Sequence, residues 1–363
     1  MESKVEILPF VADRLEDAKA VVTNVFGASV CRILDQVLSN PLLRKIDNAN
    51  AGEVVYVNGR PEGFNAVVLR KLFLGKQQMF GSIGSTLGLT DVARKEMVAF
   101  DLLAKVVKPR LGSVIFFGNS ANKDGMRINR ALGMTGQAPK SCAEKKIAVL
   151  RPLRFAWYLV RSKVFRGKGY SVCHKINVRI DKQLTINGCT FRFASSFFVG
   201  EFDEFWNDYV KHNDGLVCSR TGEELDWIFG YRLSTGRAVC VEMVNKTKMV
   251  GYIIFTVDNS GKVWNVGDMI VMSNDKSMLD LLLKGGLKLL KAATSVVHCT
   301  ISGFADCFQS IIEKHFSISR ALTNNQFAWK IQDPKVLDVE YQLLNSEKSW
   351  FFGPYDGDIC MCG

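Results

Sequence analysis

The sequence predicts a mixed α/β (α+β) protein of two halves, each with a largely antiparallel central sheet flanked by helices. Its 363 residues are too many for one ordinary domain, and two domains are the usual solution at this length. With 47% hydrophobic and 23% charged residues, the composition is that of a globular chain. Apolar runs of strand length alternate with longer runs of helical periodicity, and one order of elements occurs twice. That recurrence predicts a duplicated domain.

The first half, residues 1–150, is expected to hold two helices, a hairpin, a third strand, a helix, a buried strand, a helix and a last strand. The strands are expected at 54–57, 64–69, 77–87, 113–117 and 146–150. The helices are expected at 13–22, 29–40, 91–107 and 119–132, with Asp91 as an N-cap and Gly133 closing the last one. The hairpin turn falls at 58–61, where Asn-Gly precedes Arg-Pro.

The second half, residues 202–363, repeats this order. Its helices are expected at 202–214, 223–233, 276–293 and 304–316. Its strands are expected at 238–244, 249–257, 263–272, 296–301, 327–331 and 350–352. Residues 151–201 lie between the halves and predict a basic linker that contains a helix (151–165) and a hairpin (176–193).

Positive charge gathers around this linker. The net charge is +11, and residues 140–182 contain twelve Lys or Arg against Glu144 and Asp181, with aromatic residues interleaved. Such a patch attracts anions, such as a phosphorylated ligand or an anionic membrane surface. Nucleic acid is a less favoured partner that the sequence does not exclude. A solvated linker face is the alternative. The helix at 151–165 is interpreted either as lying on an anionic membrane or as packing its aromatic residues between the two domains.

No stretch is apolar enough to cross a bilayer, and the N-terminus lacks the layout of a signal peptide. We therefore expect a cytoplasmic protein, with a peripheral position on the inner membrane as a further option. The ten cysteines lack paired spacings, so they predict buried apolar side chains and no metal site. Neither a P-loop nor a G-x-G-x-x-G fingerprint occurs, which disfavours nucleotide hydrolysis and dinucleotide binding.

Two stretches carry a family resemblance. GRPEGFNAVVL (59–69) is followed by a turn, a strand and a helix, and NKDGMRINRALGM (122–134) is similar to N-x-x-A-x-x-L-Y-x-K-x-G-F. With the order of elements, they resemble the GNAT (N-acetyltransferase) superfamily. The chain is similar to tandem GNAT-like proteins linked to bacterial polysaccharide biosynthesis, and its final segment FFGPYDGDI (351–359) resembles theirs.

The resemblance implies acetyl-CoA or another acyl-CoA as the cofactor. In the family, a Q/R-x-x-G-x-G/A loop holds the pyrophosphate through backbone N–H groups. The aligned stretch here is RKEMVA (94–99), where Met97 replaces the first glycine and Glu96 adds a negative charge, while 273–279 shows no such loop. The implied cofactor-binding residues are Thr90, Arg94, Lys95, Met97, Val98, Ala99 and Asn122.

Two residues are the catalytic candidates. The family's acidic Tyr corresponds to Asn129, which donates a hydrogen bond but supplies no titrating proton. Asp268 stands in the middle of a strand of the second half, where a carboxylate that faces a cleft acts as a general base. A structural role in the sheet is the alternative for Asp268.

Three functions follow as hypotheses. The first is an acyl-CoA-dependent N-acyltransferase that acts on a small-molecule amine, with an amino sugar as one acceptor. The second is a catalytically degenerate GNAT-like module that binds an anionic partner, favoured by Glu96, Met97 and Asn129. The third is an aminoacyl-tRNA-dependent transferase, which the basic patch permits.

Overall fold

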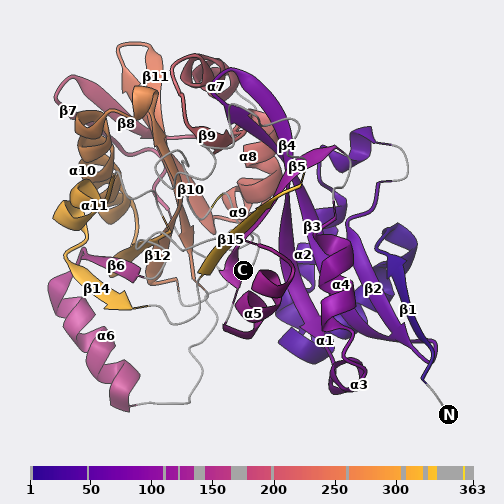
Figure 1. Cartoon of the computed structure of the whole chain (residues 1–363). Coiled ribbons are helices and arrows are strands. Elements are labelled where there is room, and N and C mark those ends of the chain that lie inside the picture. Colours follow the sequence, from indigo (N-terminus) through magenta and orange to yellow (C-terminus); the bar gives the residue numbers. More distant parts are fainter. Residues whose placement is uncertain are drawn as a thin grey trace.

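The structure, a computed structural model, describes residues 3–46, 49–108, 112–121, 123–134, 144–164, 178–197, 200–258, 261–303, 308–321, 326–332 and 355. Within these residues the chain forms two mixed sheets flanked by helices (Figure 1), which confirms the predicted fold class. No helix in these ranges is long and apolar enough to span a membrane.

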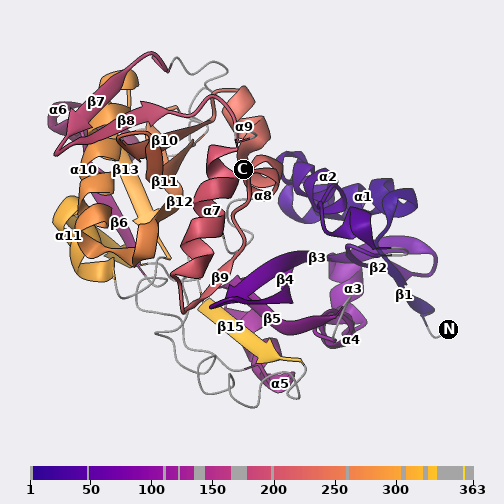
Figure 2. The same cartoon turned by 90° about the horizontal axis from the view of Figure 1, so that it is seen from above.

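The first sheet is built mostly from the N-terminal half. Its strands run in the order β1-β2-β3-β4-β5-β15, and β9 (Leu216–Cys218) pairs with β3. The bounds are β1 Val5–Pro9, β2 Gly52–Val57, β3 Arg60–Leu74, β4 Gln77–Leu89, β5 Ser113–Ala121 and β15 Gln326–Ile331. Helices α1 (Leu15–Phe26) and α2 (Arg32–Leu38) cover one face. On the other face lie α3 (Asp91–Lys95) and α4 (Ala99–Val106), as Figure 2 shows.

The second sheet has the order β14-β6-β13-β12-β11-β10-β8-β7. Its bounds are β6 Glu144–Val149, β7 Gln183–Ile186, β8 Cys189–Phe193, β10 Ala238–Asn245, β11 Lys248–Val257, β12 Val263–Val271, β13 His298–Ser302 and β14 Ile318–Ala321. Helix α7 (Glu201–Lys211) packs on one face. The opposite face carries α10 (Lys276–Ala293) and α11 (Gln309–His315).

The two sheets exchange strands. β6 comes from before the predicted boundary at 150, yet it pairs with β13 in the second sheet. β15 comes from the C-terminal half and pairs with β5 in the first sheet. Tyr355 adds a further link, because the guanidinium groups of Arg70 on β3 and Arg220 beyond β9 both lie over its ring, 4.4 and 4.5 Å from the ring centroid. Each half therefore completes the other's sheet.

Several predicted elements differ from the observed ones. The single helix expected at 91–107 is two helices, because the turn at 96–98 separates α3 from α4. The helix expected from residue 119 starts later, since β5 continues to Ala121 in its pairing with β15, and α5 spans Lys123–Ala131. The short strands β9 and β14 were not predicted. The strand expected at 350–352 lies outside the described residues.

Candidate functional site

In the first sheet, the parallel pair β4–β5 stops halfway along the strands. Its last paired residues are Ile83 and Phe117, although β4 continues to Leu89 and β5 to Ala121. Just beyond, the register of β4 against β3 shifts by one residue, and Thr86 has a left-handed φ of 53°. This is a β-bulge, which leaves its extra residue outside the hydrogen-bonded ladder. Backbone groups become available where the two strands separate.

Two glycines lie where the pairing ends. Gly84 and Gly118 face each other where the pairing ends, and a Cβ on Gly118 would lie 3.8 Å from the Gly84 carbonyl oxygen. Gly84, Thr86 and Gly118 are half-buried while most of their neighbours in the strands are fully buried. The hydroxyl groups of Ser85 and Thr86 lie 3.1 Å apart at the bulge. These hydroxyls were not among the residues predicted from the sequence.

Asn65 is a further polar group beside the bulge. It lies on β3 opposite the bulge of β4, at the position that has no paired residue on β4. Asn65 is only 1% exposed. Neither its amide nitrogen nor its amide oxygen has a hydrogen-bond partner within the described part of the chain. A buried amide without a partner costs about 1–3 kcal/mol, so such a group needs a functional or structural reason. The sequence offered no signal for it beyond a polar residue in an apolar run.

The predicted cofactor loop lies at the junction of α3 and α4. Thr90, and not the predicted Asp91, caps α3, because it accepts a hydrogen bond from Ala93 N at 3.4 Å. The Thr90 hydroxyl also donates to the Glu62 carboxylate. Met97 has a φ of 54°, the left-handed conformation that glycine adopts freely, and its side chain is 81% exposed. No side chain caps α4 at Val98. The first N–H groups of α4 are therefore open to an anion.

The other predicted residues of this loop differ in placement. Arg94 is exposed and pairs with Asp91 at 3.4 Å, and Lys95 is exposed next to it. Val98 is buried and Ala99 half-buried at the start of α4. Glu96 accepts a hydrogen bond from the Ser3 hydroxyl at 2.8 Å. Asn122 lies outside the described residues, whereas Asn129 is half-buried on α5.

The second sheet repeats the interrupted pairing. Parallel pairing of β12 with β13 ends at Asn265 and Thr300, and the register of β12 against β11 shifts at Gly267. At the helix that follows, however, the Asp275 side chain accepts hydrogen bonds from the N–H groups of Ser277 and Met278, at 2.7 and 3.0 Å. Those amides are already occupied, so the N-terminus of α10 does not fit a phosphate.

Asp268 follows this second bulge and is fully buried. Arg220 Nε and Nη2 donate to its two oxygens at 2.9 and 3.1 Å, and the Tyr252 hydroxyl donates to Oδ2 at 2.8 Å. Both partners of the ion pair have no exposed side-chain surface. In this arrangement Asp268 holds Arg220 and Tyr252 in place. The general-base role predicted for it stays a prediction.

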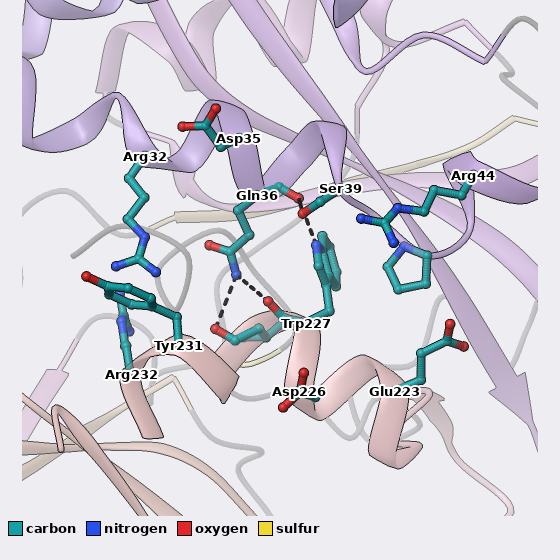
Figure 3. Close-up of a pocket in the computed structure, with 12 residues that line it drawn as sticks. Arg32, Asp35, Gln36, Ser39, Arg44, Glu223, Asp226, Trp227, Tyr231 and Arg232 are labelled. Carbon is teal, nitrogen blue, oxygen red and sulfur yellow. Dashed lines mark hydrogen bonds between the residues drawn. The ribbon is translucent and has the colours of Figure 1, made fainter. Parts of the chain in front are cut away.

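A pocket of about 560 Å³ lies between the two halves, where α2 faces α8 (Gly222–Leu225), a π-helical turn (Asp226–Gly230) and α9 (Tyr231–Ser234). Figure 3 shows Gln36 of α2 and Trp227 of the π-helical turn, two lining residues, hydrogen-bonded to each other. Gln36 Nε2 donates to the Trp227 and Ile228 carbonyl oxygens at 2.9 and 3.2 Å, and Trp227 Nε1 donates to the Gln36 carbonyl oxygen at 2.7 Å. The side chain of Gln36 thus satisfies carbonyl groups of the π-helical turn.

The charged groups that line this pocket balance. Three are arginines and three are carboxylates: Arg32, Arg44, Arg232, Asp35, Glu223 and Asp226. The Arg32 guanidinium lies over the ring of Tyr231 (Figure 3). Burial raises the pKa of Asp226. Two of these carboxylates also pair with lysines outside the lining, Asp35 with Lys19 at 3.8 Å and Glu223 with Lys45 at 3.4 Å.

Solved structures show what the fold is similar to. The sequence matches no protein-family model and no curated protein. The structure is similar to a GCN5-related N-acetyltransferase from Anabaena variabilis, with a TM-score of 0.57, 13% identity, and 91% of this chain and 73% of that chain covered. N-myristoyltransferase of Saccharomyces cerevisiae with bound myristoyl-CoA gives a TM-score of 0.54 at 11% identity, over 91% of this chain and 80% of that one. The chain therefore has the fold of the GCN5-related N-acetyltransferases.

Proposed function

We propose that this chain is an acyl-CoA-dependent N-acyltransferase, with a small-molecule amine such as an amino sugar as the acceptor. The observation that carries the proposal is the bulge at Thr86, located where β4 and β5 stop pairing and where backbone is accessible. A GCN5-related N-acetyltransferase and an N-myristoyltransferase with bound myristoyl-CoA have similar folds, which adds support. A cytoplasmic location and a link to bacterial polysaccharide biosynthesis stay predictions.

The first half fits an acyl-CoA. The uncapped N–H groups at the start of α4 suit a pyrophosphate, and the left-handed turn at Met97 directs that side chain into solvent. Arg94 and Lys95 add positive charge beside these N–H groups, while Asp91 pairs with Arg94, and Glu96 and Asp101 add negative charge. Bound acyl-CoA supplies an activated thioester. The backbone of the bulge and the Asn65 amide are the candidate donors for its carbonyl oxygen, and Asn129 is the candidate donor for the sulfur.

The test is a calorimetric titration with acetyl-CoA and a long-chain acyl-CoA, with desulfo-CoA and a polyanion as comparators. The proposal expects a dissociation constant below about 0.1 mM, or roughly −5.5 kcal/mol, for at least one acyl-CoA. Binding would then direct a search for transfer to amines and amino sugars. No detectable heat with any acyl-CoA would overturn the proposal.

A catalytically degenerate module is the second candidate function. The specific observation in its favour is Asp275, whose side chain occupies the N–H groups at the start of α10. If both halves have lost the cofactor, the polyanion comparator binds and acyl-CoA does not. Titration with tRNA then separates an aminoacyl-tRNA-dependent transferase from a general anion-binding module, because the former binds tRNA far more tightly than an unrelated polyanion.

A further inference from the structure

Helix α6 (Pro152–Val164) is apolar on two opposite faces. One face packs inward, where the Phe155 and Tyr158 rings lie 5.1 and 5.3 Å from the His298 ring. The other face presents Leu153, Trp157 and Val160, which are 88%, 65% and 52% exposed. Their spacing of four and three residues places them in one stripe along the helix. A helix that is apolar on both sides is normally covered on both sides.

The described residues of the first half do not cover this stripe. Figure 1 shows α6 at the edge of the second half, below β6 and β14 and away from the N-terminal helices. The hypothesis that its aromatic residues pack between the two domains is therefore wrong, because Phe155 packs on the second sheet with Ile147 and Val297. Trp157 faces solvent.

The charges beside the stripe have one sign. Arg154 and Arg161 are exposed on α6, and neither forms an ion pair with a described residue. Residues 151–180 contain eight Lys or Arg and no Asp or Glu. An apolar stripe within a purely basic segment is complementary to a surface that is apolar inside and negatively charged outside.

We propose that α6 is an interfacial helix that binds an anionic lipid bilayer, with Leu153, Trp157 and Val160 inserted among the lipids and Arg154 and Arg161 at the headgroups. Tryptophan favours this boundary because its ring is apolar and its N–H is polar. A nucleic acid would use the arginines but leave Leu153 and Val160 in water. A second copy of α6 would bring like charges together. This inference is independent of the proposed enzymatic activity.

The test is co-sedimentation of the full chain with vesicles of equal parts phosphatidylglycerol and phosphatidylcholine, and with vesicles of pure phosphatidylcholine. We expect binding to the anionic vesicles at low salt and its loss at high salt. The double variant Arg154→Glu/Arg161→Glu removes two positive charges from α6. Each charge contributes about a fivefold change in affinity, so the affinity for anionic vesicles is expected to fall at least about 25-fold. Trp157→Ser weakens binding without a change in charge. All three positions are exposed, so the variants keep the native melting temperature.

The matched control is Lys76→Glu/Lys276→Glu, which makes the same change in net charge at exposed lysines outside α6 and keeps most of the binding. Quenching by brominated lipids adds a positional readout, since it is expected to drop in Trp157→Phe although five other tryptophans remain. Three outcomes overturn the proposal. The first is that the chain does not bind anionic vesicles. The second is that the α6 variants and the control variant lose vesicle binding equally. The third is that the chain forms a dimer or a nucleic-acid complex that only the α6 variants disrupt, and does not bind vesicles.

Discussion

Arg220 and Asp268 form a bidentate ion pair with no exposed side-chain surface, although 48 residues separate them in the chain. Arg220 also donates to the Cys218 carbonyl oxygen at 2.7 Å, and its guanidinium lies against the ring of Tyr355. β9 extends the first sheet, whereas Asp268 belongs to β12 in the second. The pair therefore ties the two sheets together at the bulge of β12.

Asp268→Asn is expected to destabilise the protein by about 3–5 kcal/mol, because it leaves the buried Arg220 charge without a counter-ion. The measurement is unfolding by guanidinium chloride. Pairing the change with Arg220→Met removes both charges and should recover much of the loss. If Asp268→Asn leaves stability intact and abolishes only acyl transfer, Asp268 is a catalytic base and its structural role is wrong.

Elements with strong local patterns could be predicted from the sequence. The helix predicted at 276–293 has those bounds in the structure, since its apolar positions repeat with helical spacing and Asp275 caps it. The hairpin β10–β11 begins and ends within one residue of the prediction, because Asn245–Lys248 marks the turn. Local chemistry decides such elements.

Features that depend on distant segments could not be predicted. The exchange of β6 and β15 pairs residues far apart in sequence, and neither strand's own residues indicate its partner. The partner of Asp268 and the isolation of the Asn65 amide arise only when the sheets assemble. Met97 aligns with a glycine of the family's loop, which pointed to this position. Methionine itself does not indicate a left-handed backbone conformation.

Asn65→Val is expected to raise the free energy of unfolding by about 1–3 kcal/mol, because it removes a buried amide that has no partner among the described residues. If the amide binds the acyl carbonyl group, the same change lowers acyl-CoA affinity or the transfer rate by about tenfold. Denaturation and calorimetry measure the two effects. Trp264→Phe is the control, since it removes another buried donor without a described partner, in the second sheet. Equal acyl-CoA binding and equal acyl-transfer rates in all three proteins would exclude a role for Asn65.

Because His298 is buried, we expect the stability of the fold to fall in acid. Burial lowers the pKa of His298, and Lys145 and Arg320 lower it further, against the opposing effect of Asp258. The unfolded chain, with a pKa of about 6.5, therefore binds more protons than the folded one, and stability is lost as the pH falls below about 6.5. His298→Leu should flatten the dependence of unfolding free energy on pH between about 7 and 5. An unchanged slope in the variant would assign the acid sensitivity to other groups.

Met97→Gly is expected to stabilise the chain by about 1 kcal/mol and to strengthen acyl-CoA binding. A non-glycine residue at a φ of 54° costs about 1–3 kcal/mol, of which the greater freedom of glycine in the unfolded chain offsets a part. Removing the side chain also lets a pyrophosphate approach the N–H groups at the start of α4 more closely. Thermal unfolding and calorimetric titration with acetyl-CoA measure the two gains.

Lys246→Gly separates the two effects of Met97→Gly. Lys246 has a φ of 56° in the turn between β10 and β11, so its replacement relieves the same backbone strain on an exposed hairpin. We expect a similar gain in melting temperature and no change in acyl-CoA affinity. If both variants bind acyl-CoA like the original chain while both gain stability, Met97 is a strained turn residue only. A gain in affinity confined to Met97→Gly would place the pyrophosphate at the turn before α4, because only that variant alters it.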